Sequence, residues 1–341
     1  MNEAAPDPRV KRWVAKAADT LLEVSVVGSF SRVGYLVRRH FEAWERPHRL
    51  DGQTVIVTGA SSGIGQAAAI ELASLGATVW LVGRNTERLR AAGEEAARTG
   101  SGGQIHTAPV DLLDASAVTR FTDRVAATCD ELHGLIHNAG ALFPDYGVAD
   151  DGSGIVSERT VATHVLAPFR LTWQLAPLLV RPRRSVLVTV TSGGMYTQRF
   201  DADHIEDGPE GYRGAVAYAR AKRAQVVLSR EWARRWGGEG VASYAVHPGW
   251  VDTPGLVSGL PTFAKLGPVL RTPAQGADTV VWLAADEPRR RIASEPIRGL
   301  WHDRHERGEH YLPTTRRTSS QDEEDGSALW NWCVSRTGLG R

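Results

Sequence analysis

The sequence predicts an α/β protein built around a doubly wound parallel sheet. From Gly52 onward, short apolar runs alternate with longer segments of helical periodicity. Crossovers between parallel strands place helices over both faces of a sheet, so this alternation is typical of that architecture. A glycine-rich loop joins the first apolar run to the first helical segment, and the 341 residues suffice for one large domain of about 250 residues with extensions.

Six short apolar runs are expected to form buried strands. They are Val55–Val57, Thr78–Val82, Gln104–Ala108, Gly134–His137, Val186–Val190 and Ala242–Val246. Six segments between and after them are expected to be helical. These are Gln66–Leu75, Thr86–Ala97, Ser116–Thr128, Gly154–Val180, Tyr218–Trp236 and Pro273–Ala285.

The chain divides into three expected parts: a helical, amphipathic N-terminal extension (1–50), the domain that contains the sheet (51–312), and a polar linker with a C-terminal tail (313–341). The apolar stretch of the extension is interrupted by Glu23 and is shorter than the ~20 residues that a membrane-spanning helix needs. Its aromatic side chains, interleaved with arginines, favour packing on the main domain or on a second subunit. The alternative is peripheral contact with a membrane surface.

Composition narrows the class of protein further. Basic and acidic residues nearly cancel, 40 against 39, so no global field attracts nucleic acid. Cys129 and Cys333 are too few for a disulfide framework or a thiolate metal site, and no secretory signal pattern is present, so we expect a cytoplasmic protein. The spacing of His302, His305 and His310 matches no tetrahedral zinc pattern, so we expect no metal and interpret that stretch as a polar edge strand with a loop.

The glycine-rich loop carries the first functional signal. It runs Thr58-Gly59-Ala60-Ser61-Ser62-Gly63-Ile64-Gly65 between a strand and a helix, the context in which backbone N–H groups bind a dinucleotide pyrophosphate. Gly59 permits a tight turn, Gly63 allows the backbone to approach the phosphates, and Gly65 allows close packing of helix on strand. The alternative is a plain tight turn. The loop predicts a Rossmann-type domain.

The end of the second strand indicates which dinucleotide is bound. An acidic residue there would bind the ribose 2′-hydroxyl of NAD, but Arg84 occupies the position. A guanidinium suits a 2′-phosphate, so NADP(H) is favoured, with NAD(H) still possible and a solvated arginine as the alternative. Asp111 and Leu112 follow the third strand, where an adenine is expected, although Asp111 is equally consistent with a cap on the next helix.

A second motif, Tyr218-x-x-x-Lys222, supplies a proton donor. The two side chains lie one helical turn apart on the same face. The Lys222 ammonium is expected to favour the tyrosinate and so lower the pKa of Tyr218 from its usual value near 10. Ser192, after the fifth strand, is placed to hydrogen-bond a substrate oxygen. These groups together predict hydride transfer to a carbonyl, with proton donation by Tyr218.

These residues, with Asn138-Ala139-Gly140 and Pro248-Gly249, occur in the order typical of the short-chain dehydrogenase/reductase family, which the chain resembles from about Leu50 to His310. The resemblance implies that Asn138, Ala139, Gly140, Pro248, Gly249 and Val251 contact the cofactor, that Thr253 bonds its carboxamide, and that Lys222 also binds the nicotinamide ribose. Within the family, residues 137–142, 192–195, 225–228 and 247–255, together with the extension, resemble one subgroup.

One position departs from the family pattern. The family commonly has an asparagine in the helix after the fourth strand, where it holds a water that relays protons from the lysine; here His164 stands in that register. Either His164 continues the relay with a changed pH dependence, or it is a structural residue bonded to a backbone carbonyl. Both interpretations remain open from the sequence.

The sequence favours an apolar ketone, aldehyde or alcohol as substrate. The expected cleft side chains are Ala141, Leu142, Phe143, Tyr146, Met195 and Trp250, and Val257–Leu270 is the expected lid. The competing interpretation is a non-catalytic NADP(H)-binding sensor or scaffold; an epimerase is a third, but its glycine spacing usually differs. The long helices at Gly154–Val180 and Tyr218–Trp236 resemble those through which family members associate, so we expect a homo-oligomer unless an extension blocks that surface.

Overall fold

The predicted sheet is present in the computed structural model, which describes residues 8–23, 25–259, 266–285, 300–309 and 319–340. Its eight strands run in the order β10-β9-β8-β7-β4-β1-β2-β3, and all neighbours pair in parallel except β9 with β10. The strands are β1 Thr54–Thr58, β2 Thr78–Gly83, β3 Ile105–Pro109, β4 Gly134–His137, β7 Ser185–Val190, β8 Val241–Val246, β9 Leu300–His302 and β10 His305–Arg307. All six expected strands are confirmed.

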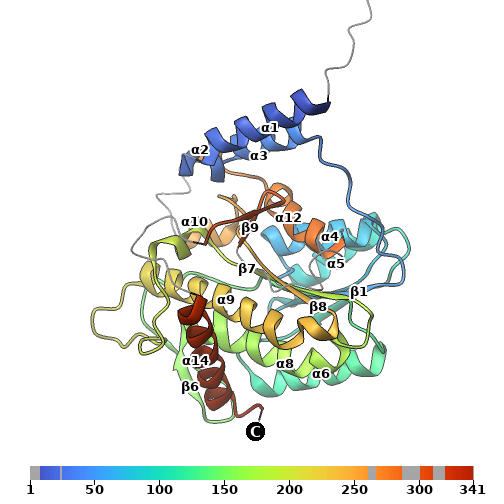
Figure 1. The fold of residues 1–341 in the computed structure, drawn as a ribbon. Coiled ribbons are helices and arrows are strands. Elements are labelled where there is room, and N and C mark those ends of the chain that lie inside the picture. Colours follow the sequence, from blue (N-terminus) through green and yellow to red (C-terminus); the bar gives the residue numbers. More distant parts are fainter. Residues whose placement is uncertain (1–7, 24, 260–265, 286–299, 310–318, 341) are drawn as a thin grey trace, which may run out of the picture.

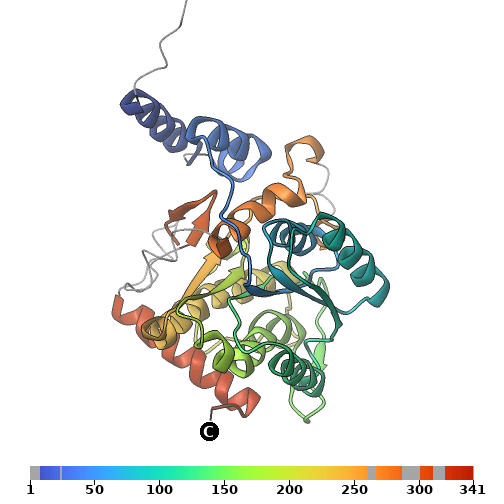
Figure 2. The same cartoon turned by 90° about the vertical axis from the view of Figure 1, so that its right-hand side faces the viewer.

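Helices cover both faces of the sheet, as expected for a doubly wound fold (Figures 1 and 2). One face packs on α4 Gly63–Ser74, α5 Thr86–Thr99 and α12 Pro273–Ala285. The other packs on α6 Ala115–Thr128, α8 Ala167–Leu179, α9 Gly214–Trp236 and α14 Ser319–Thr337. Short helical segments lie in the connections between these elements: α7 Arg159–Val161, η1 Ala162–Leu166, η2 Gly193–Thr197, η3 Gly237–Glu239, α10 Pro254–Gly259 and η4 Gly267–Val269.

The helix expected from Gly154 to Val180 begins later than predicted. A two-stranded hairpin, β5 Val148–Asp150 with β6 Val156–Glu158, occupies its start. The turn contains Gly152 and Gly154, both at positive φ, which suits a reversal of the chain better than a helix. The Glu158 carboxylate then accepts the first free N–H groups of α7, from Thr160 and Val161, and so begins the helix.

The C-terminal segment differs from the expected linker. Residues 310–318, and the expected lid residues 260–265, lie outside the described residues. Ser319–Gly326, which we expected to extend the linker, form the first turns of α14. Glutamate and glutamine favour helix, acidic groups suit a helix N-terminus, and Asp322 pairs with Arg230 of α9 at 2.9 Å.

Helix α14 covers the helices that we expected at a subunit interface. Trp330 of α14 is buried against Phe169 and Trp173 of α8 and against Trp236 of α9, with ring centroids 5.0–6.0 Å apart. The two views place α14 along α9 on the side of the molecule away from the N-terminal helices (Figures 1 and 2). This part of the expected association surface is therefore occupied by the chain's own C-terminal helix.

The N-terminal extension forms three helices, α1 Pro8–Glu23, α2 Val26–Phe30 and α3 Arg32–Glu42, beside α12 and β9 (Figure 1). Its inner side packs on the main domain, as favoured from the sequence: the Tyr35 hydroxyl donates to Asp278 Oδ2 at 3.2 Å. None of the helices described here is both long enough and apolar enough to cross a bilayer.

Candidate active site

The predicted cofactor residues gather where the winding of the sheet reverses. Strands β2 and β3 lie on one side of β1, and β4, β7 and β8 lie on the other. Ligands of doubly wound folds bind at the carboxyl ends of the strands beside such a reversal. The glycine loop follows β1, Asn138-Ala139-Gly140 follows β4, and Ser192 follows β7, so three predicted segments leave the same edge of the sheet.

Thr58 and Asn138 join the two central strand ends. The Thr58 hydroxyl donates to the Ile136 carbonyl at 3.1 Å and accepts from the backbone N–H groups of Asn138 and Ala139 at 3.0 and 3.1 Å. The Asn138 amide donates to the carbonyls of Thr58 and Gly59 at 3.0 and 3.3 Å. These two side chains therefore fix the shape of the loop rather than point into solvent.

The loop glycines are required by backbone geometry. Gly59 and Gly63 have φ of 65° and 57°, in the left-handed region that favours glycine. A Cβ at Gly65 would lie 2.4 Å from both Asn138 Nδ2 and the Gly59 carbonyl oxygen, so the helix packs on the strand end only because that atom is missing. Helix α4 begins at Gly63 after Ser62, which directs free N–H groups toward an incoming anion.

Two other loop residues serve packing. The Ser61 side chain lies against Gly83 at the end of β2, with its hydroxyl 3.4 Å from the position of a Gly83 Cβ. Ile64 packs at the edge of the core cluster and approaches Gly276 of α12. They hold the loop between β2 and α12.

Arg84 lies at the carboxyl end of β2, next to the loop. It is exposed, and the following Asn85 caps α5 by accepting from the Arg88 N–H at 2.8 Å. The backbone N–H of Ala60 donates to the Val82 carbonyl at 3.1 Å, which ties the loop to the strand that carries Arg84. A guanidinium at this position has solvent access and can meet an anionic group beside the glycine loop.

Asp111 does not cap the next helix, which was one of its two expected roles. Asp114 is the cap of α6, accepting from the Ala117 N–H at 2.9 Å. Asp111 instead closes the preceding turn by accepting from the Leu113 N–H at 3.0 Å, and its side chain is exposed. It therefore lies at the sheet edge beside β3, as the adenine role requires.

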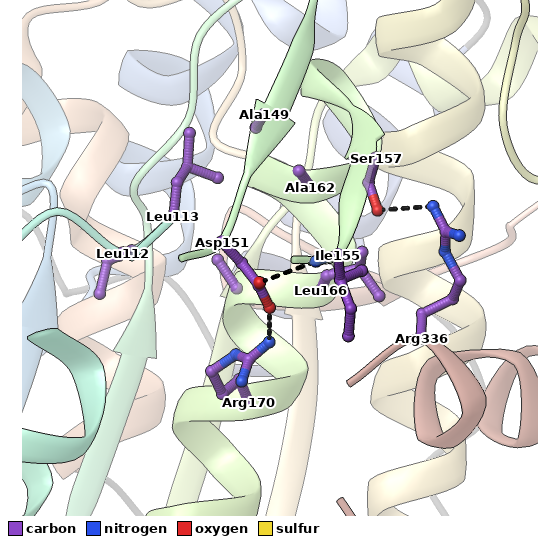
Figure 3. A pocket seen from close by; sticks show the side chains of 11 residues that line it. Leu112, Leu113, Ala149, Asp151, Ile155, Ser157, Ala162, Leu166, Arg170 and Arg336 are labelled. Atoms are coloured by element: carbon purple, nitrogen blue, oxygen red, sulfur yellow. Dashed lines mark hydrogen bonds and ion pairs between the residues drawn. The ribbon is translucent and has the colours of Figure 1, made fainter. Parts of the chain in front are cut away.

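Leu112 borders a small pocket between the start of α6, the β5–β6 hairpin and α8 (Figure 3). Its charged groups already have partners: Asp151 pairs with Arg170, and Arg336 donates to the Ser157 hydroxyl at 2.8 Å and pairs with Glu206, which lies outside the pocket lining. Leu112 is the one expected cofactor residue among those that line this pocket, and the glycine loop and the residues after β4, β7 and β8 do not reach it, so we assign no binding function to it.

The predicted catalytic groups come together at the ends of β7 and α9. Ser192 and Tyr218 share a hydrogen bond between their side chains. Lys222, one turn along α9, donates from Nζ to the Val190 carbonyl at 2.9 Å, and its Nζ lies 5.5 Å from the centroid of the Tyr218 ring. Tyr218 remains partly exposed, whereas Lys222 is buried.

The pKa of Tyr218 moves in the opposite direction to our expectation. Although the side chain as a whole keeps some exposure, its phenol is desolvated, which raises this pKa above its usual value near 10, and the hydrogen bond from Ser192 only partly opposes the change. Burial also lowers the pKa of Lys222 from 10.5 to about 7, because a desolvated ammonium is unfavourable. The predicted lowering of the tyrosine pKa by a permanent ammonium is therefore wrong for this structure. The phenol holds its proton at neutral pH, which suits proton donation.

His164 lies in a π-helical turn, with its ring edge-on to that of Tyr218 at a centroid distance of 5.3 Å. Its Nε2 donates to the Ala141 carbonyl at 2.9 Å, so this nitrogen carries the proton. Burial, aided by the nearby Lys222, lowers the pKa of His164 to about 3. The expected titration near neutrality is thus wrong, and the bond to a backbone carbonyl is present. Its Nδ1 is buried with no hydrogen-bond partner among the described residues.

The loop after β8 approaches the glycine loop from the other side. A methyl carbon of Thr253 lies 3.1 Å from the position of a Gly63 Cβ, and the Thr253 hydroxyl accepts from the Leu256 N–H at 3.2 Å. Gly249 has a φ of 80°, and Val251 is buried against Gly276. Pro248, Gly249, Val251 and Thr253 therefore follow β8 at the edge of the sheet that bears the glycine loop, and Thr253 touches that loop.

Sequence reasoning missed the residues behind this loop. Phe30, Arg38, Arg271, His302 and Asp303 are all buried there, although they come from both ends of the chain. His302 donates from Nδ1 to the His247 carbonyl at 2.8 Å. No set of three or more histidine, cysteine, aspartate or glutamate side chains that would suit a metal ion occurs in the described segments. Residue spacing in the sequence gives no indication of contacts between positions as far apart as Phe30 and Asp303.

Met195 and Tyr146, two of the residues expected to line the substrate cleft, differ in their exposure. Met195 is fully buried in a cluster with Phe30 and Val226, so its role as a cleft-lining residue was a wrong prediction. It falls on the inner side of η2, the short helix that Ser192 begins. Tyr146 is exposed and meets Tyr212 edge-on at 5.6 Å.

Comparison with known proteins gives consistent results. Residues 53–259 match the family model of short chain dehydrogenases. The chain is 37% identical over 278 residues to dehydrogenase/reductase SDR family member 12 of Bos taurus, covering 81% of this chain and 84% of that relative, which confirms the subgroup resemblance. It is 33% identical to human retinol dehydrogenase 11 over 70% of this chain and 74% of that protein.

A solved structure supports the same assignment. The short chain dehydrogenase of Escherichia coli CFT073, solved in complex with NADPH, aligns with a TM-score of 0.55 and 29% identity over 71% of this chain and 94% of its own. The fold, the strand-end geometry and these likenesses agree. The chain therefore belongs to the short-chain dehydrogenase/reductase family, oxidoreductases that bind a nicotinamide cofactor and act on small-molecule carbonyls or alcohols.

Proposed function

We propose that this protein is an NADP(H)-dependent oxidoreductase that interconverts an apolar ketone or aldehyde and the corresponding alcohol. The observation that carries the proposal is the meeting of Ser192, Tyr218 and Lys222 at the strand edge that also bears the glycine loop. A bound nicotinamide supplies or accepts the hydride. The protein supplies the proton and the binding groups.

In the reducing direction, Tyr218 donates its phenolic proton to the carbonyl oxygen. The high pKa that burial gives this phenol keeps the proton in place at neutral pH until the substrate oxygen gains charge. Ser192 donates a hydrogen bond to the same oxygen, and the charged form of Lys222 stabilises the developing tyrosinate. Oxidation uses the same groups in reverse and requires the tyrosinate as a base.

Arg84 supports NADP(H) over NAD(H). Its guanidinium is exposed at the end of β2, beside the glycine loop, where a ribose 2′-phosphate is expected. The positive φ of Gly59 and Gly63 and the free N–H groups at the start of α4 fit a pyrophosphate, so the residues suit the whole dinucleotide. The Escherichia coli relative was solved with NADPH.

An apolar substrate is supported by the residues near Tyr218. The Phe143 backbone lies against the start of α9, the helix that carries Tyr218, because a Cβ at Gly214 would lie 2.1 Å from the Phe143 carbonyl oxygen. The Arg159 guanidinium lies 4.2 Å from the centroid of the Phe143 ring, and Tyr146 follows in the sequence. One relative is named for retinol, an apolar alcohol. The alternative, a sensor or scaffold that binds NADP(H) without turnover, is favoured only by the unusual His164.

A panel of apolar ketones, aldehydes and alcohols, assayed with NADPH, NADP⁺, NADH and NAD⁺ in parallel, tests the proposal. We expect NADPH oxidation with at least one apolar carbonyl and much slower turnover with NADH. Tight NADPH binding without turnover of any compound would favour the sensor, and faster turnover with NADH would overturn the cofactor assignment.

We further propose that the protein acts in the cytoplasm and contacts anionic membrane surfaces through its extension. Cys129 and Cys333 are both free, which supports a reducing compartment. Among the side chains of the extension whose exposure the structure describes (15–23 and 25–50), six large apolar ones are exposed: Leu21, Val26, Val27, Val33, Leu36 and Phe41. Asp19 and Glu23 turn inward to pair with Arg38, while Arg32 and Arg39 are exposed, so the outer charge is largely basic.

Flotation with vesicles distinguishes this surface from a subunit contact. We expect binding to vesicles that contain phosphatidylglycerol, weaker binding to phosphatidylcholine alone, and loss of binding in a Val33→Ser, Leu36→Ser double variant. Val148→Ser, which removes an exposed apolar side chain on β5, is the control. Equal binding of all variants, or no binding at all, would contradict the proposal. Association of two subunits through α8 and α9 would require displacement of α14, so we do not propose an oligomer formed through these helices.

A further inference from the structure

The extension reaches the inside of the main domain through Phe30. This side chain is only 3% exposed, and its ring meets His247 edge-on at a centroid distance of 4.3 Å. It also contacts Trp250 at 6.2 Å and His302 at 5.3 Å between ring centroids. Its backbone carbonyl accepts from the Trp250 N–H at 2.8 Å. A residue of the extension thus packs directly behind the loop that follows β8.

Arg271 joins the extension to that loop. Its guanidinium is buried and donates to the carbonyls of Phe30 at 3.0 Å, Ser29 at 2.9 Å and Pro248 at 3.5 Å. A Cβ at Gly249 would lie 2.3 Å from Arg271 Nε, so the loop backbone rests against the guanidinium. One side chain therefore contacts both the extension and the Pro248-Gly249 turn.

Asp303 and Arg38 hold Arg271 in place. Asp303 accepts from both terminal nitrogens of Arg271 and from Arg38 Nη1 at 2.7 Å. Burial acts to raise the pKa of the Asp303 carboxyl, but the charges of His302, Arg271 and Arg38 outweigh it and keep that pKa well below its usual range. Arg38, in α3, also pairs with Asp19 and Glu23 at 2.7 Å each. The carboxylates offset the buried arginines, as burial of charge requires.

The same cluster touches the catalytic side of the site. Gly193 directly follows Ser192, and a Cβ there would lie 3.0 Å from His247 Nε2 and 3.3 Å from Phe30 Cε2. Phe30 is therefore in contact with the backbone that carries the catalytic serine, while its carbonyl is bonded to the turn expected beneath the nicotinamide.

We propose that Phe30 and Arg38 are positioning residues for catalysis: the N-terminal extension fixes the Pro248-Gly249 turn and the Ser192-Gly193 backbone, and so sets the nicotinamide half of the cofactor site. The inference rests on the proposed function. The adenine half has its own supports, Thr58, Asn138 and the β2 end, and the hydrogen bonds of Thr58 and Asn138 involve neither Phe30 nor Arg38. Loss of Phe30 or Arg38 is thus expected to weaken binding to the nicotinamide half and to leave binding to the adenine half unchanged.

The test compares two ligands on Phe30→Leu and Arg38→Met. Adenosine 2′,5′-bisphosphate probes the adenine half alone, and NADPH probes both halves. We expect an unchanged Kd for the bisphosphate, an NADPH Kd raised on the order of tenfold, and a kcat lowered on the order of tenfold to a hundredfold, because small displacements of reacting groups are costly. The controls, Lys16→Met and His40→Leu, remove exposed side chains of the extension and are expected to match the unmodified protein.

Several outcomes would overturn the inference. Unchanged NADPH affinity and kcat in both variants, or equal losses of affinity for the two ligands, would show that the extension does not act on the nicotinamide half. If Arg38→Met fails to fold, the milder Phe30→Leu decides alone. Failure of the unmodified protein to bind either ligand would refute the proposed function instead, so the two failures are distinguishable.

Discussion

The two halves of the cofactor site are built in different ways. The adenine and pyrophosphate half comes mainly from one continuous stretch, the strand, loop and helix of residues 54–74, with Arg84 directly after the next strand and Asn138 bonded to the loop. The nicotinamide half combines the ends of β7, α9 and β8 with Phe30, Arg271 and Asp303, which are up to 273 positions apart in the chain. The first half depends on local backbone geometry, and the second depends on a buried tertiary network.

This difference separates two requirements of the enzyme. A pyrophosphate needs N–H groups in a fixed turn, which glycines at positive φ make possible. A nicotinamide must be held at the right distance from a carbonyl carbon, and that placement depends on the buried residues that pack behind the Pro248-Gly249 turn. Substitutions in the adenine half should therefore change the Kd of the cofactor, whereas substitutions in the nicotinamide half should also lower kcat and kcat/KM.

Apart from loss of the Tyr218 hydroxyl itself, the largest effect is expected in the nicotinamide half, at Lys222. Lys222→Met removes the charge that stabilises the tyrosinate and the donor expected to bind the ribose, so kcat/KM should fall about a thousandfold. Steady-state kinetics with NADPH and an active carbonyl measure the change, with the exposed Lys16→Met as control. A loss below tenfold would mean that Lys222 has no part in the chemistry.

In the adenine half, Arg84→Ala should act on affinity. Loss of a charge-assisted bond to a 2′-phosphate is expected to raise the NADPH Kd about tenfold to a hundredfold and to leave the NADH Kd nearly unchanged. Fluorescence titration gives both constants, and Arg88→Ala, an exposed arginine one turn into α5, is the control. Equal weakening of both cofactors would remove the basis for NADP(H) preference.

The pH dependence tests the nicotinamide half again. The pKa of Lys222 is about 7, so its ammonium is present below that pH and is lost as the pH rises. Reductive kcat/KM should fall above pH 7 by about tenfold per pH unit, and Lys222→Arg should move this fall to higher pH. Oxidation needs the tyrosinate, and the raised pKa of Tyr218 places its optimum at higher pH. Identical profiles in the two directions would be inconsistent with these assignments.

The smallest effect is expected at His164. Its pKa of about 3 keeps the ring neutral over the working range, and its proton is bonded to the Ala141 carbonyl. His164→Asn, which restores the residue common in the family, should change kcat by less than about threefold and leave the pH profile in place. A shift of the profile would show that His164 does carry protons.

The comparison also explains how far sequence reasoning reached. Periodicity located all six expected strands, and the glycine positions followed from backbone geometry that any such loop needs. The pKa direction of Tyr218 was not predictable, because the spacing to Lys222 says nothing about how deeply either group is buried. The role of Arg271 was equally hidden, since its partners lie in the extension and after α12.

The C-terminal segment illustrates the same limit. A stretch as polar as Ser319–Gly326 predicts a linker. In the structure it is helical, because Asp322 forms an ion pair with Arg230 of α9 and Trp330 packs on aromatic side chains of α8 and α9. Tertiary contacts of this kind override local composition.

The most direct measurement is NADPH binding and turnover by Tyr218→Phe, beside the control Tyr244→Phe, which removes the hydroxyl of a tyrosine buried in β8 away from the site. If Tyr218 is the proton donor, its variant binds NADPH with unchanged affinity and loses at least a thousandfold in kcat, on the order of what a positioned general acid contributes, while the control keeps full activity. Retained turnover in Tyr218→Phe would contradict the assignment and with it the proposed mechanism.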